Sequence, residues 1–166
     1  MKVLLAYLAG LATAVAVPAA LVHAGIFDIG AAAGPLPLEQ TVAPWARDRA
    51  VARRAPKGPN PHPGESPAAL ERYRAACLSC HGAPGLEPAV FARGLQPMAP
   101  DLASSAVQAR PDGELFWITR HGLRATGMPS LVDGGDEDAW RLVAFLRRLP
   151  RLSDAEKAAL AAEGRR

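Results

Sequence analysis

The feature that most constrains this chain is the pentapeptide Cys-Leu-Ser-Cys-His at residues 77–81. It contains the only two cysteines of the 166-residue sequence. Two thiols separated by two residues, with His81 directly after them, are typical of three sites. These are a redox-active dithiol, part of a zinc site, and a covalent haem attachment point. Each needs a different protein around it, so the remaining sequence has to discriminate among them.

A long apolar segment opens the chain. After Lys2, residues 3–22 carry no charge and are long enough to span a hydrocarbon core as a helix. The segment also resembles a secretory signal, because Val22 and Ala24 form a small-residue cleavage site. With Lys2 inside, both interpretations export the remainder. We favour a transmembrane anchor over residues 1–24, because its apolar run exceeds the usual signal core. A cleaved signal and a buried soluble helix are the alternatives.

The composition then changes twice along the chain. Residues 25–65 are rich in Pro, Ala and Gly and are expected to be a linker, with a short amphipathic helix broken near Pro44. That helix suits either a membrane surface or packing on the following domain. Residues 66–150 contain nine Arg and nine Asp or Glu, so the net charge of +3 lies in the flanking segments. No basic stretch is interleaved with aromatic residues, which argues against nucleic-acid binding.

The compact domain is expected at residues 66–150, and its pattern is helical. Ser66 and Pro67 predict the start of a helix that continues to Gly82. Further helices are predicted over 113–122 and 137–149, the last with an apolar stripe that includes Trp140. No segment alternates convincingly with period two. We therefore predict an all-α fold of about three to five helices with long Pro/Gly-rich loops. Residues 151–166 form a last short helix and tail, whose surface we expect to be dispensable.

This context separates the three interpretations of the cysteine motif. A zinc site usually has four ligands, and here no second cysteine pair exists. A redox dithiol of the thioredoxin type follows a strand, and no clear strand is predicted. Cysteines three residues apart lie on one face of a helical turn, so Cys77 and Cys80 can both bond one porphyrin, with His81 beneath the iron. The sequence thus favours one covalent c-type haem, whose apolar surface would also enlarge a thin core.

A haem iron bound by one histidine leaves a sixth position to fill. Three downstream residues are candidates: Met98, His121 and Met128. Met128 lies between Gly127 and Pro129 in a loop between helices, where its thioether would be presented rigidly. We predict Met128 as the sixth ligand, which gives a His81/Met128 iron. Met98 and His121 are the less favoured alternatives.

The segment from about Ser66 to Pro150 resembles the class I monohaem c-type cytochromes. The resemblance is carried by CLSCHG at 77–82, TGMPS at 126–130 and DAWRLVAFLRRLP at 138–150. It implies that Tyr73 packs on the C-terminal helix against Trp140 or Phe145. Ala69 stands where the family usually has glycine at the helix crossing, so the approach should be slightly less close. GELFWITRHGLRATGMP at 113–129 is similar to membrane-anchored bacterial members, which supports an anchor.

Such a cytochrome carries electrons and is not an enzyme. We expect a one-electron Fe(III)/Fe(II) carrier in the cytoplasmic membrane, with the haem domain on the periplasmic side and redox proteins of an electron-transfer chain as partners. The alternatives are a haem enzyme or gas sensor with an open sixth position, in which His121 would act, and a subunit of a dehydrogenase or oxidase. Trp117 and three arginines are candidates for haem propionate contacts: Arg93, Arg120 and Arg124.

Overall fold

The computed structural model describes residues 1–64, 66–131 and 134–162, and it divides into two compact units. The first unit, Met1–Gly34, contains helix α1 (Lys2–His23) and a 3₁₀ turn, η1 (Ala31–Ala33). No residue of α1 is buried in the unit. The helix is long and apolar enough to cross a membrane, a test that a signal sequence also passes.

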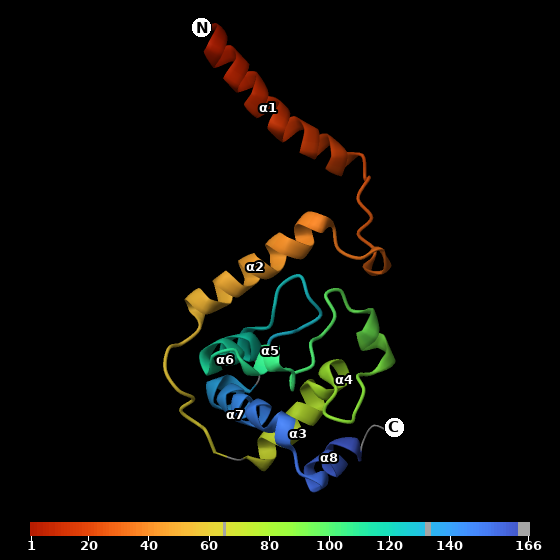
Figure 1. Cartoon of the computed structure of the whole chain (residues 1–166), viewed down its shortest axis with the longest axis vertical. Helices are drawn as coiled ribbons and strands as arrows, with labels where there is room; N and C mark the ends of the chain where they lie inside the picture. The colour runs from red at the N-terminus through yellow and green to blue at the C-terminus, as the bar shows by residue number, and fades with distance from the viewer. Residues whose placement is uncertain (65, 132–133, 163–166) are drawn as a thin grey trace. The chain divides into compact units, whose positions relative to one another are not determined.

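The second unit, Pro35–Arg166, is built from helices and loops (Figure 1). An isolated bridge between Ala83 and Leu86 is the only β pairing among the described residues. The predicted all-α class is therefore confirmed. The helices of this unit are α2 (Pro37–Arg54), α3 (Pro67–Ala76), α4 (Leu78–His81), α5 (Ser105–Gln108), α6 (Asp112–His121), α7 (Gly135–Arg148) and α8 (Asp154–Ala161). The unit also contains two 3₁₀ elements, η2 (Val90–Gly94) and η3 (Leu149–Arg151).

The first helix of the domain begins as predicted but ends early. Ser66 is the N-cap residue of α3 and Pro67 occupies its first turn. The expected continuous helix to Gly82 is wrong, because the chain turns at Cys77, with φ −117° and ψ −39°. The Cys77 carbonyl accepts from the amides of both Cys80 and His81, at 3.1 and 3.0 Å. These two hydrogen bonds to one carbonyl mark the boundary between α3 and the short α4. They also hold the cysteine motif as a single turn.

Helices α3 and α7 cross at the centre of the core. Ala69 and Tyr73 of α3 are buried there, together with Leu142 and Phe145 of α7. The Tyr73 and Phe145 rings lie 5.2 Å apart with their planes tilted by 50°. Of the two partners expected for Tyr73, the structure selects Phe145. Trp140 stacks instead on Phe116 of α6, at 4.2 Å.

Tyr73 also ties the core to the end of the cysteine motif. Its hydroxyl donates to the Gly82 carbonyl at 2.6 Å, and burial raises the pKa of Tyr73 well above its usual value. The hydroxyl is therefore a neutral donor directly beside His81. Tyr73→Phe leaves a buried carbonyl without this donor, which should lower the free energy of unfolding by about 1–2 kcal/mol. Urea unfolding of the haem-loaded protein measures the loss. Tyr7→Phe, on the exposed surface of α1, is the control, and an equal effect of both changes would contradict the assignment.

Helix α2 differs from the expected broken helix. It continues through Pro44 and lies beside α6 (Figure 1). Its side chain Val51 is almost fully buried, at 1% exposure. Of the two alternatives for this helix, the structure selects packing on the domain. This burial stabilises a helix that has lost one backbone hydrogen bond at proline.

The last helix is better integrated than the sequence suggested. Ser153 caps α8, and the side chains of Ser153 and Glu156 bond each other's backbone amides. Leu160 has no exposed surface and belongs to the same core cluster as Tyr73. Arg148 of α7 also forms an ion pair with Glu156. Helix α8 therefore contributes a buried side chain and an ion pair to the domain, which the sequence did not predict.

Candidate cofactor site

One cavity of about 280 Å³ brings the predicted site residues together. Its wall includes Cys77, Cys80 and His81 from the motif. It also includes Met128, from a loop 47 residues after His81. Much of the remaining wall is aliphatic, with contributions from Leu115, Ile118, Leu142 and Leu146. An apolar cavity lined by two thiols, one imidazole and the thioethers of Met98 and Met128 offers the donor set of a covalent haem.

The two thiols are held one turn apart by the chain reversal at Cys77. Both cysteines are half-buried and neither forms a disulfide. Burial raises the pKa of the Cys77 thiol to about 12, so this group is protonated at neutral pH. A protonated thiol is a poor nucleophile, so Cys77 itself is not a reactive thiolate at neutral pH.

The His81 ring is oriented by a backbone partner. Its Nδ1 lies 2.8 Å from the Pro100 carbonyl oxygen. A carbonyl only accepts, so Nδ1 carries the hydrogen and Nε2 keeps its lone pair for a metal. Burial lowers the pKa of His81, and the hydrogen bond to Pro100 offsets part of that effect. The ring is therefore a neutral imidazole, the form that ligates iron.

Met128 is presented by a loop with its own hydrogen bonds. The Met128 carbonyl accepts from the Leu123 amide at 3.2 Å. Its amide donates to the Thr126 hydroxyl oxygen at 3.1 Å, and that hydroxyl donates to the Leu123 carbonyl at 2.7 Å. The loop also passes close to Gly122, where a Cβ would lie 2.7 Å from the Met128 oxygen. These contacts fix the backbone on both sides of the thioether.

Gly122→Ala should displace this loop. Gly122 has a φ of +65°, and a Cβ would lie 2.6 Å from the Pro129 carbonyl carbon. We expect a destabilisation of about 1–3 kcal/mol from the backbone strain, and a weaker iron–thioether absorption band. The matched control is Gly85→Ala, because Gly85 has a φ of +83° but open space around its Cβ position. Both variants carry the strain, so an equal loss of the band in both would contradict the steric role of Gly122.

The alternative ligands Met98 and His121 lie in different surroundings. Met98 also lines the cavity but is 68% exposed, and it follows the cis Gln96–Pro97 bond. His121 is not among the described residues of the cavity wall; its ring lies 5.0 Å from that of Trp117. Trp117 is absent from the described wall as well.

None of the three arginines suggested for propionates is among the described residues of the wall. Arg93 lies 3.9 Å from Glu87, and Arg120 pairs with Asp136 at 2.9 Å.

Two arginines that the sequence did not single out do line the cavity: Arg47 of α2 and Arg110, just before α6. Burial acts to lower the pKa of Arg110, but the Asp48 and Glu114 carboxylates raise it more, so the net change is upward. Arg110 is therefore a permanent cation. The pairing between Asp48 and Arg110 joins residues 62 positions apart, so no local pattern could have revealed it.

Comparison with known families agrees with this geometry. Residues 65–146, just under half of the chain, match the family model described as cytochrome c oxidase, cbb3-type, subunit III. The match supports a monohaem c-type cytochrome domain over these residues. No curated protein matches the chain.

A cytochrome domain of this family carries a covalently bound haem c, and Cys77 and Cys80 supply the required spacing. The family match supports a haem-based electron-transfer role and suggests redox partners in an electron-transfer chain. The family is typically non-enzymatic. The N-terminal helix is compatible with a membrane anchor or a signal peptide.

Proposed function

We propose that this chain is a one-electron carrier whose haem is bonded to Cys77 and Cys80 and whose iron is bound by His81 and Met128. The observation that carries the proposal is the convergence of these four side chains on one apolar cavity. When bound, the haem supplies a reversible Fe(III)/Fe(II) couple. If His81 and Met128 both bound the iron, no open coordination site would be left for a substrate.

The residues around the cavity support this role in distinct ways. The Pro100 carbonyl fixes the tautomer and orientation of His81. The Met128 thioether is a soft ligand, which favours the less charged ferrous state and raises the reduction potential. The aliphatic wall excludes water and acts in the same direction. His121, the residue that an enzymatic role would need, is not part of the described wall, which disfavours the enzyme alternative.

The proposal extends to location and partners. The N-terminal helix would anchor the chain in the cytoplasmic membrane, with the haem domain on the periplasmic side. Because α2 packs on the domain, the tether is residues 24–36 rather than the whole predicted linker. Such a segment reaches at most about 45 Å when extended. This short reach suits electron exchange with membrane redox complexes.

A second candidate is a subunit of a membrane oxidase. It is favoured by the description of the matching family as an oxidase subunit. The electron-transfer chemistry of the chain would be the same. Purification of the chain in mild detergent distinguishes the two, because a subunit brings stoichiometric partner chains with it and a tethered shuttle does not.

Potentiometric titration of the full-length chain tests the carrier role. The chain is produced in a host with haem-attachment machinery, and Cys77→Ala/Cys80→Ala is the control without attachment. We expect one reversible transition with a slope of one electron and no consumption of added hydrogen peroxide. Peroxide turnover by the wild-type chain would contradict a carrier and support the haem-enzyme alternative.

A further inference from the structure

The segment 37–60 lies outside the region that matches the cytochrome family, yet it packs closely on the haem domain. Val51 of α2 is 1% exposed. Beyond the helix, the buried Asn60 side chain donates from Nδ2 to the Trp140 carbonyl of α7, at 2.9 Å. These are interior contacts, of a kind that a flexible linker does not make.

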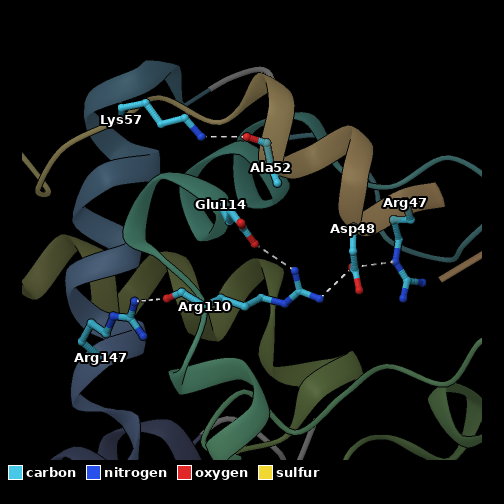
Figure 2. Close-up of polar contacts among 7 residues, drawn as sticks. All are labelled: Arg47, Asp48, Ala52, Lys57, Arg110, Glu114 and Arg147. Carbon is cyan, nitrogen blue, oxygen red and sulfur yellow. Dashed lines mark hydrogen bonds and ion pairs between the residues drawn. The ribbon is translucent and has the colours of Figure 1, made fainter. Parts of the chain in front are cut away.

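The turn after α2 fits directly against the start of α6. Lys57 donates from Nζ to the Ala52 carbonyl at 2.8 Å, which closes the end of the helix (Figure 2). A Cβ on Gly113 would lie only 2.0 Å from the Pro56 carbonyl oxygen. The side chain at position 113 must therefore be absent for this segment to dock.

Docking brings Arg47 to the haem cavity and connects it to Arg110 of the domain through one carboxylate. Asp48 lies 2.8 Å from an Nη of Arg110 and 3.7 Å from Nε of Arg47 (Figure 2). Glu114 of α6 holds the other terminal nitrogen of Arg110 at 3.1 Å. The Arg110 backbone is fixed too, since its carbonyl accepts from Arg147 of α7 (Figure 2). Helices α2, α6 and α7 thus share one polar network beside the cavity.

The charges of the wall are one-sided. Among its described residues, Arg47 and Arg110 are cationic, His81 is neutral, and none carries a carboxylate. A haem brings two carboxylates, and a guanidinium binds a carboxylate through two parallel hydrogen bonds. Asp48 and Glu114 each bond one terminal nitrogen of Arg110 and fix its orientation.

We propose that α2 is a functional part of the haem site, and that Arg47 and Arg110 bind the haem carboxylates. This inference rests on the haem of the proposed function. It assigns to a segment outside the cytochrome family match a direct role in setting the properties of the cofactor.

Arg47→Gln tests the inference on the full-length haem-loaded chain. A guanidinium beside a haem carboxylate offsets negative charge that would otherwise stabilise Fe(III). Its loss should lower the Fe(II)/Fe(III) ratio at a fixed applied potential at least threefold. That is about 30 mV for a one-electron couple at 59 mV per tenfold change. The control is Arg49→Gln, which removes the same charge from an exposed position of the same helix. An equal shift in both variants would overturn the proposal.

The pH dependence of the potential separates carboxylate binding from a structural effect. Guanidinium contacts lower the pKa of a carboxyl group. The fall in potential that accompanies carboxylate ionisation should therefore move to higher pH in Arg47→Gln and stay in place in Arg49→Gln. The charged groups facing Arg47 and Arg110 are Asp48, Glu114 and Arg147. An unchanged pH profile in Arg47→Gln overturns the role of Arg47.

Gly113→Ala tests the docking without touching either arginine. Alanine favours the helix, so α6 itself should be preserved, while its Cβ collides with the Pro56 carbonyl. Amide hydrogen exchange of residues 37–60 should become at least tenfold faster, and the potential should shift in the same direction as in Arg47→Gln. The control is Gly94→Ala, where a Cβ has open space. Unchanged exchange in Gly113→Ala would show that the segment is not docked.

These outcomes are independent of the axial ligands. If the wild-type spectrum lacks an iron–thioether band, the Met128 assignment fails, while the exchange experiment still reports on α2. If the band is present in wild type and Arg47→Gln alike and the potential does not move, the ligand set stands and this inference fails.

Discussion

Met128→Ala is expected to change the haem iron more than any of the substitutions proposed above. Loss of the thioether removes the soft ligand that stabilises the ferrous state, so the reduction potential should fall by on the order of 0.1–0.3 V. Axial ligation spans about 0.8 V across haem proteins, so a shift of this size is expected for a lost ligand. The long-wavelength band of the ferric protein should disappear, and the ferrous protein should bind carbon monoxide. Absorption spectroscopy and potentiometry measure these three effects.

Met98→Ala is the matched control for this prediction. Met98 lines the same cavity but is 68% exposed, and the loop bonds around Met128 have no counterpart among its described contacts. Its removal should leave the band and the potential close to wild type. A lost band in Met98→Ala together with an intact band in Met128→Ala would reassign the sixth ligand to Met98.

Leu142→Ala is expected to be the most destabilising of the proposed substitutions. Leu142 is 1% exposed, belongs to the core cluster of α3 and α7, and also lines the haem cavity. Alanine is a good helix former, so the cost arises from lost packing and the hole that remains. Truncation of a buried leucine costs about 2–5 kcal/mol. Urea unfolding of the haem-loaded chain should show a loss in this range.

The control for this loss is Leu38→Ala. Leu38 lies on α2 with 74% of its surface exposed, so its truncation should change the free energy of unfolding by less than about 0.5 kcal/mol. Equal stabilities of the two variants would mean that Leu142 is not packed between the core and the haem. The account of the cavity wall would then be wrong.

The parts of the fold that the sequence predicted correctly depend on local signals. Ser66 and Pro67 mark the start of α3, and Ser153 marks the start of α8, because capping uses residues within one turn. The apolar stripe of α7 follows from helical periodicity. The spacing of Cys77, Cys80 and His81 predicts the cofactor because these three residues are close together in the sequence. All of this information lies within a few neighbouring residues.

The features that the sequence did not reveal depend on contacts between distant segments. Pro44 suggested a broken helix, but burial of Val51 against the domain offsets the lost hydrogen bond. The link from Asp48 to Arg110 and the fit of Gly113 under the Pro56 carbonyl have no local pattern. The positions of Arg47 and Arg110 at the cavity wall could therefore not be predicted from the sequence. Long-range pairing of this kind becomes visible only when the fold is known.

The absorption spectrum of the unmodified full-length chain tests the central claim most directly. It is recorded in the ferric state, in the ferrous state, and in the ferrous state with carbon monoxide. We predict a long-wavelength iron–thioether band in the ferric spectrum and no change of the ferrous spectrum on adding carbon monoxide. Absence of the band, together with a change of the ferrous spectrum on adding carbon monoxide, would contradict a His81/Met128 iron. It would indicate a ligand-binding haem protein instead of an electron carrier.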